Sequence, residues 1–200
     1  MDSQVKNFYN QNYKRFDTSR YSVWLEVKKF FEKIPAEVRV LDAGCGNGKN
    51  MIYLQNKGIL VKGIDFSEKL LQICINKNLD VEEADIRQLP FPDNSFDYVI
   101  SIAVIHHLSK ESDRHKAINE MLRVCKPGGK VLFSTWALEQ PCTSRFNFVL
   151  GDNFVKWEDT KRYYYIYDKE NINNFLKDYN LESLVLDQGN YFINLAKTDD

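Results

Sequence analysis

The sequence predicts an α/β fold in which helices cover both faces of a mostly parallel sheet. Three observations carry this prediction. Strand-like apolar runs alternate with helical patterns from residue 38 to residue 136, a glycine-rich turn follows the first run, and the chain changes to a hairpin pattern near its end. Strands and helices that alternate at this pace are typical of βαβ units. A chain of 200 residues, 44% of them hydrophobic, is long enough to bury one substantial core.

The elements follow in order from the N-terminus. Residues 1–35 are expected to form a helical segment that caps a substrate site, because apolar residues from Val23 to Ile34 recur at helical spacing until Pro35. Strands are then expected at 38–43, 59–65, 79–85, 96–104 and 129–136, and helices at 48–57, 67–77 and 110–125. Ser67 is placed to cap its helix.

The end of the chain departs from this alternation. Residues 137–160 contain aromatics without periodicity, which indicates an irregular insertion on the acceptor side. A strand at 162–167, a helix at 169–179 and a hairpin at 183–196 should add antiparallel edge strands to the sheet. No linker composition divides the chain, so we expect residues 1–200 to form a single domain.

Composition excludes several classes of protein. The formal net charge of -1 and the pI of about 6.3 show no overall basic excess, so any nucleic-acid contact must come from a local patch. The four cysteines form no CxxC pair, which argues against a disulfide framework or a thiolate zinc site, and we expect no metal in this chain. We expect no membrane contact and a cytoplasmic location, with a nuclear pool left open.

The glycine-rich turn is the first sign of a ligand. Gly44, Gly46 and Gly48 lie between the first strand and the first helix, where open α/β sheets bind nucleotides. Their GxGxG spacing differs from the GxGxxG of dinucleotide binders. Asp42 precedes the turn, and its carboxylate would repel a diphosphate but could receive a cation. Alone, the glycines could also make nothing more than a tight βα turn.

Two further acids follow the next two strands. Asp65 closes the second strand about 20 residues on, where an acid accepts hydrogen bonds from a ribose diol. After the third strand, Asp85 could receive an adenine amino group while Ile86 lies on the ring. Together with the turn, these residues indicate adenosine with a cationic, amino-acid-like tail, which is S-adenosylmethionine (SAM).

Four motifs then resemble those of class I SAM-dependent methyltransferases, in order and across most of the chain. They are DAGCGNG, GIDFS, EADIRQLPFPDNSFDYVIS and VCKPGGKVLFSTW. The resemblance implies a Rossmann-like, seven-stranded sheet with an antiparallel last strand. It adds Phe66, Ser101 and Ile102 to the expected cofactor residues, and it implies S-adenosylhomocysteine as the second product.

A closer resemblance comes from SRYSVW, SIAVIHHLS, WALEQ and RYYYIYDKEN. Together they are similar to segments of the eukaryotic tRNA wobble-uridine carboxyl methyltransferases. Those enzymes esterify 5-carboxymethyluridine to 5-methoxycarbonylmethyluridine. The carboxylate is already an anionic nucleophile, so the expected mechanism needs no general base, only donors that hold the acid in line with the methyl group.

We expect six acceptor-side residues in or near the three segments that should face the methyl group, which are Arg20, His106, His107, Trp136, Glu139 and Arg145. The cations and histidines would orient the acid, and Trp136 could stack on uracil. Each has an ordinary structural alternative. One of the two adjacent histidines could simply be packed, Arg20 could form a surface ion pair, Trp136 could belong to the core, and Glu139 could hold an arginine.

Partners are also implied. Local cations could track tRNA phosphates near the anticodon loop, namely Lys6, Lys14, Arg15, Arg20, Arg145, Lys156, Lys161 and Arg162. A small zinc-binding methyltransferase activator subunit is expected to pair with the third strand, at about residues 79–86, although Glu82 and Glu83 could instead protect that edge. Two alternatives stay open: a methyltransferase for a small quinone, sterol or carboxylic acid, and a non-catalytic SAM-binding partner subunit.

Overall fold

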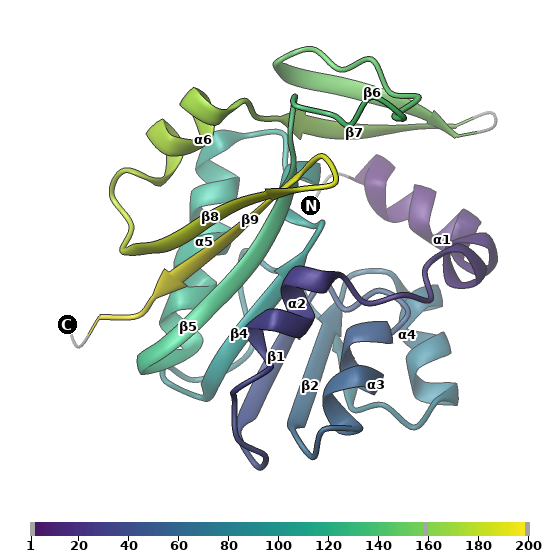
Figure 1. Cartoon of the computed structure of the whole chain (residues 1–200). Coiled ribbons are helices and arrows are strands. Elements are labelled where there is room, and N and C mark those ends of the chain that lie inside the picture. The colour runs from purple at the N-terminus through teal and green to yellow at the C-terminus, as the bar shows by residue number, and fades with distance from the viewer. Residues whose placement is uncertain (1–2, 158–159, 199–200) are drawn as a thin grey trace.

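A computed structural model describes residues 3–157 and 160–198 and confirms the seven-stranded sheet (Figure 1). The strand order is β3-β2-β1-β4-β5-β9-β8, in which β9 runs antiparallel to both neighbours. The strands of this sheet are β1 (Arg39–Ala43), β2 (Leu60–Asp65), β3 (Val81–Glu83), β4 (Phe96–Ile102), β5 (Cys125–Trp136), β8 (Leu181–Asp187) and β9 (Asn190–Ala196). The order reverses between β1 and β4, which is where sheets of this kind bind ligands.

The helices cover both faces, as the alternation predicts. They are α1 (Ser3–Ser19), α2 (Leu25–Phe30), α3 (Lys49–Gln55), α4 (Glu68–Asn76), α5 (Glu111–Val124) and α6 (Lys169–Leu176), with a 3-10 turn, η1, at Ile105–His107. Residues of α2, α3 and α4 pack in one apolar cluster and those of α5 and α6 in another. The hydroxyl of Ser67 accepts a hydrogen bond from the Leu70 N–H, which confirms the predicted cap.

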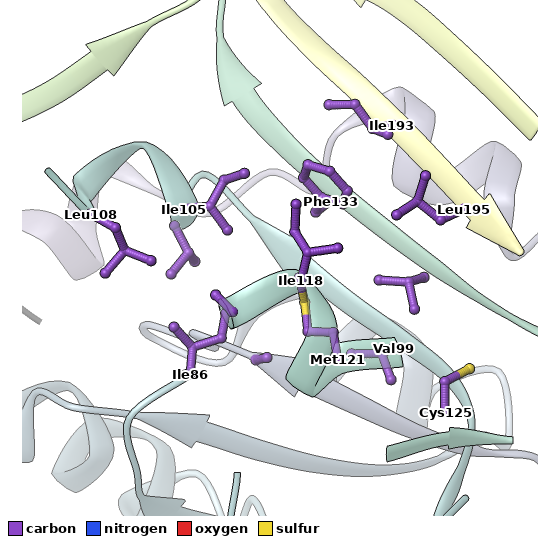
Figure 2. Packing of buried hydrophobic residues seen from close by; sticks show 14 of the residues in the cluster. Ile86, Val99, Ile105, Leu108, Ile118, Met121, Cys125, Phe133, Ile193 and Leu195 are labelled. Carbon is purple, nitrogen blue, oxygen red and sulfur yellow. The ribbon is translucent and has the colours of Figure 1, made fainter. Parts of the chain in front are cut away.

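Side chains from the same strand alternate between these two clusters. In β1, Val40 packs in the cluster on the α3 side and Leu41 in the cluster on the α5 side. In β5, Leu132 packs on the α3 side and Phe133 on the α5 side. Figure 2 shows the α5 side, where Met121 and its neighbours pack beneath β4, β5 and β9. Both faces of the central strands are therefore buried, so the sheet positions its carboxyl ends rigidly.

The insertion is more regular than expected. Within 137–160, the prediction of an irregular loop is wrong for Gly151–Trp157, which forms β6. This strand pairs with β7 (Thr160–Ile166) in a separate two-stranded ribbon, so the predicted 162–167 strand does not extend the main sheet. An isolated β-bridge between Ala137 and Tyr167 connects the end of the ribbon to the carboxyl end of β5. In Figure 1 the ribbon stands clear of the main sheet, beside α1.

The N-terminal segment holds two helices, α1 and the short α2. Helix α1 packs on α4 and on β7, where Val5, Phe8 and Tyr9 form a third apolar cluster with Leu70 and Tyr163. This helix therefore bridges the sheet's cofactor side and the ribbon. Among the described residues, no helix has the length and apolar character needed to cross a bilayer.

Candidate functional site

A cavity of about 650 Å³ opens at the carboxyl ends of β1, β2 and β4, at the reversal of strand order. Its volume falls in the range of ordinary ligand sites. The glycine turn, Asp65 and Phe66 line one half. Both histidines of η1, Trp136 and the ribbon line the other half, and the segment after α1 lines the mouth. The cavity thus has a cofactor half and an acceptor half.

Backbone geometry explains the glycines of the turn. Gly44 and Gly48 have φ angles of +90° and +78°, which residues with a side chain rarely adopt. A Cβ at Gly44 would lie 2.4 Å from Val104 Cγ2, and one at Gly48 would lie 2.2 Å from Leu79 Cδ1. Both a required backbone conformation and a close approach therefore demand glycine. Gly44 and Gly46 line the cavity, whereas Gly48 does not and instead lets the helix start against Leu79. We call this turn the glycine cradle.

Two buried acids flank this cradle. Asp65 lines the cavity and accepts hydrogen bonds from the N–H groups of Gly46 and Ser67, each at 2.9 Å. Burial nevertheless raises the pKa of Asp65 to about 6. Asp42 lies beneath the turn, off the cavity wall, and burial followed by the charge of Asp65 raises its pKa to about 7. The carboxylate of Asp65 on the cavity wall suits a ribose diol, and Asp42, about half ionised near pH 7, places only part of a negative charge behind the turn. This arrangement is compatible with SAM.

The remaining predicted cofactor residues divide into two groups. Ile102 and Phe66 line the cavity. Asp85, Ile86 and Ser101 do not, for different reasons. The Arg87 guanidinium binds the carboxylate of Asp85 at 2.6 Å, whereas Ile86 and Ser101 are buried in the protein. The structure therefore uses Asp85 to hold Arg87 and does not place it on the cavity wall.

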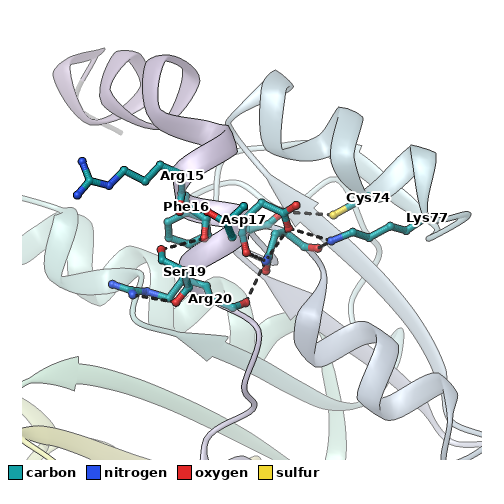
Figure 3. A network of polar contacts seen from close by, with 10 residues as sticks. Arg15, Phe16, Asp17, Ser19, Arg20, Cys74 and Lys77 are labelled. Atoms are coloured by element: carbon teal, nitrogen blue, oxygen red, sulfur yellow. Dashed lines mark hydrogen bonds and ion pairs between the residues drawn. The ribbon is translucent and has the colours of Figure 1, made fainter.

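Helix α1 is fastened to the glycine turn by polar contacts (Figure 3). Asp17 accepts hydrogen bonds from the Asn47 amide at 2.9 Å and from Lys77 Nζ at 3.0 Å. Asn47 also donates to the Arg20 carbonyl at 3.0 Å. Because Asn47 lies inside the turn, the end of α1 and the start of the next segment are held directly over the cofactor half.

The two histidines differ in what their ring nitrogens do, although both rings line the cavity. The backbone N–H of Trp136 donates a hydrogen bond to His106 Nδ1 at 3.2 Å, so the ring proton of a neutral His106 is on Nε2. His107 has both nitrogens engaged, with Tyr9 and with the Tyr163 carbonyl. Burial lowers the pKa of both rings, to about 3 for His107. His106 can therefore donate an N–H to a ligand, whereas His107 is occupied.

Arg162 is a site residue whose position the sequence analysis missed. It was expected on a phosphate-tracking surface, but its side chain is 4% exposed and lines the acceptor half. Its guanidinium lies 4.7 Å and 4.8 Å from the ring centroids of Phe8 and Tyr164. Within the described part of the chain, it makes no ion pair with a carboxylate. The signal was the two-residue period of RYYYIY, which puts Arg162 and Tyr164 on one face.

Trp136 lines the cavity as expected but has limited room for a base. It stacks on Tyr164 with centroids 4.2 Å apart and an interplanar angle of 8°. Phe146 and Phe148 each contact it at 5.1 Å and 40°. The aromatic surface of the acceptor half is therefore a group of rings, with Phe146 on the cavity wall and Tyr21, 85% exposed, at the mouth.

The other three predicted acceptor residues lie apart from one another. Arg20 lines the mouth, where its guanidinium lies 5.8 Å from the Phe16 ring. Glu139 and Arg145 do not line the cavity. Glu139 accepts hydrogen bonds from the Tyr191 hydroxyl at 2.7 Å and from the Lys169 N–H at 3.1 Å, and Arg145 lies over Phe146. Glu139 thus joins β9 to α6 in place of facing a substrate.

The fold, the glycine turn and the acid that closes β2 are those of a class I SAM-dependent methyltransferase. A family model described as a methyltransferase domain matches residues 41–133. A chain of a Haloferax volcanii complex, between the Trm112 methyltransferase activator and a methyltransferase, superposes with a TM-score of 0.75 at 16% identity. That match covers 98% of each chain and reports on the fold.

Two curated relatives identify the family. A tRNA (carboxymethyluridine(34)-5-O)-methyltransferase of Schizosaccharomyces pombe is 38% identical over 80% of this chain and 70% of its own length. The enzyme of the same name from Arabidopsis thaliana is 45% identical over 70% of this chain, which spans 34% of that longer protein. The chain belongs to the tRNA (carboxymethyluridine(34)-5-O)-methyltransferase family, which confirms the resemblance drawn from its motifs.

Proposed function

We propose that this protein methylates the carboxylate of 5-carboxymethyluridine at the tRNA wobble position, with SAM as donor, to give 5-methoxycarbonylmethyluridine. The observation that carries the proposal is Arg162, a buried cation with no carboxylate partner among the described residues, on the acceptor half of the cavity. Burying a lone charge is costly unless a countercharge joins it. An anionic acceptor would supply that charge, and the names of the two curated relatives specify a carboxymethyluridine acceptor.

The residues of the acceptor half suit a carboxylate that must be oriented without being protonated. SAM supplies an electrophilic methyl group that the acid takes as an ester, with S-adenosylhomocysteine as the other product. The guanidinium of Arg162 and the Nε2–H of the neutral His106 ring offer hydrogen-bond donors to the acid. No general base is required, because the acceptor oxygen is already anionic.

The tRNA backbone would lie across α1 and the ribbon. Exposed cations occur on both, at Lys14 and Arg15 on α1 and at Lys156 and Lys161 on the ribbon. The two elements are in contact, since the Arg15 guanidinium lies 5.1 Å from the Trp157 ring. Such a patch beside the cavity mouth would bind phosphates even though the whole chain has no basic excess.

The proposed reaction is tested by methyl transfer from labelled SAM to tRNA that carries 5-carboxymethyluridine, with and without the activator subunit. We expect label in one wobble nucleoside, and we expect mild alkali to release it because an ester hydrolyses there. Matched tRNA that carries 5-carbamoylmethyluridine should take up no label. Alkali-stable label, transfer to a small quinone, sterol or free acid, or SAM binding without any transfer would each contradict the proposal.

We further propose that an activator subunit adds a strand to β3, an edge of the sheet. Asp80 accepts a hydrogen bond from Gly63, and Ala84 donates one to Asp65, so the even-numbered residues of this strand face β2. The backbone groups of Val81 and Glu83 therefore point outward and are free to pair with a further strand. The Haloferax volcanii complex supports a partner of this kind.

Val81→Pro tests this edge. Proline removes the outward N–H of Val81 but leaves the bonds from β3 to β2, so the free chain should keep a melting temperature within roughly 3 °C of wild type. Complex formation with a zinc-binding activator, followed by size-exclusion chromatography, should be lost. Val81→Thr keeps the N–H and the branched side chain and should still bind. A stable Val81→Pro complex would show that the partner docks elsewhere.

A further inference from the structure

Tyr9 joins helix α1 to the acceptor half of the cavity through two hydrogen bonds. Its side chain is 8% exposed and lines the cavity. The hydroxyl lies 2.8 Å from a terminal nitrogen of Arg162 and 2.9 Å from Nε2 of His107. A tyrosine from the N-terminal helix therefore lies between a cation of the ribbon and a histidine that follows β4.

The direction of these two hydrogen bonds follows from a third one, which the other ring nitrogen of His107 makes. His107 Nδ1 lies 2.8 Å from the Tyr163 carbonyl, which can only accept, so Nδ1 carries the proton. Because His107 is neutral, its Nε2 must accept, and the Tyr9 hydroxyl donates to it. The oxygen of Tyr9 is then left to accept from Arg162. The chain runs one way, from Arg162 through Tyr9 and His107 to the Tyr163 backbone.

This series of hydrogen bonds fixes the orientation of the Arg162 guanidinium. Arg162 and Tyr163 are neighbours on β7, so the hydrogen bonds leave this strand at one residue and return at the next. The ring of Tyr9 also packs edge-on against His107 and Phe16. One terminal nitrogen of Arg162 is thereby occupied, and the orientation of its fork is set before any ligand arrives.

We propose that Tyr9 is a positioning residue that orients Arg162 for the carboxylate of the acceptor, and that helix α1 thereby completes the acceptor half of the cavity. The inference rests on the proposed function, because it takes Arg162 as the group that binds the acid. It also assigns His107 to the support of Tyr9 and leaves His106 as the histidine that faces the acceptor. The C-terminal end of α1 is also held against the glycine turn by hydrogen bonds, so this helix contacts both the cofactor half and the acceptor half of the cavity.

Tyr9→Phe tests the proposal because it removes only the hydroxyl. We expect the preference of the full chain, with its activator, for an anticodon stem-loop bearing 5-carboxymethyluridine over its carboxamide counterpart to fall roughly tenfold. The dissociation constant of SAM, measured by calorimetry, should stay within about twofold. Tyr13→Phe, one turn further along α1, is the matched control and should retain the wild-type preference.

The outcomes separate this inference from the proposed function. A wild-type protein without preference for the acid would overturn the function itself. A wild-type preference that Tyr9→Phe retains, or loses only together with SAM binding, would overturn the role of Tyr9. A second measurement needs no variant, since the chain has three histidines and nitrogen NMR can identify their tautomers. Finding the proton of His107 on Nε2 would make His107 the donor to Tyr9, break the directed chain of hydrogen bonds and refute the proposal.

Discussion

Replacement of Arg162 by methionine is expected to lower kcat/KM for the acceptor RNA by roughly 100-fold, about 2.7 kcal/mol, with SAM affinity unchanged. The buried guanidinium is the only cation that we place against the acid, and losing one partner of a desolvated charge pair is costly. Methionine keeps an apolar stem among the rings of Phe8, Tyr9 and Tyr164, so the ribbon should still fold. Steady-state kinetics with calorimetry of SAM binding would measure both effects.

Two companion variants sharpen this test. Arg162→Lys should recover only part of the activity, because an ammonium lacks the planar fork that binds a carboxylate through two parallel hydrogen bonds. Lys161→Met removes the exposed neighbouring cation and should change KM modestly through phosphate contacts, with kcat retained. Wild-type kcat/KM in Arg162→Met would mean that the acid binds elsewhere.

Gly44→Ala is expected to raise the dissociation constant of SAM by roughly 100-fold or more and to destabilise the fold by about 2–4 kcal/mol. Its φ of +90° is unfavourable for alanine, and the new methyl would lie 2.4 Å from Val104 Cγ2. Val104 is 8% exposed and packed in the α5-side cluster, so it has little room to yield. Calorimetry and thermal unfolding would measure the two effects.

The control for this variant is Gly128→Ala. Gly128 has a φ of +73°, but a Cβ there would meet nothing within 4 Å, and the residue lies away from the cavity. Backbone strain alone should cost about 1 kcal/mol of stability while SAM still binds normally. If Gly44→Ala bound SAM like wild type, the cradle would not be the cofactor site.

Local sequence patterns were sufficient to predict most of the sheet and the cofactor half of the cavity. Buried strands, the Ser67 cap and the glycine turn each leave a signal within a few residues, so their positions follow from periodicity and backbone geometry. Strand β6 left a weaker signal. The burial of β6 alternates only between partly buried and exposed residues, because this strand has one open face and contributes no residue to the main core. For this reason, the scattered aromatic residues of the 137–160 segment indicated a loop and not a strand.

The acceptor half depends on contacts between distant segments, which no local pattern contains. Tyr9 and Arg162 are separated by 153 positions, and their meeting requires α1 to fold back onto the ribbon. Glu139 and Arg145 were expected among the acceptor residues, but the structure uses Glu139 to hold Tyr191 and Lys169. Asp85 is likewise committed to Arg87. The role of each of these carboxylates is set by its side-chain and backbone partners, which depend on tertiary packing and leave no local pattern in the sequence.

The neutral state of the buried histidines has a consequence for the way in which the acceptor half of the cavity responds to acidity. His107 has a pKa of about 3, that of His106 is also well below its usual value, and arginine stays charged throughout. None of these groups gains or loses a proton between about pH 6 and 8. The proposed binding of an anion on this wall therefore relies on a permanent cation, and a modest fall in pH would leave the electrostatic character of the wall unaltered.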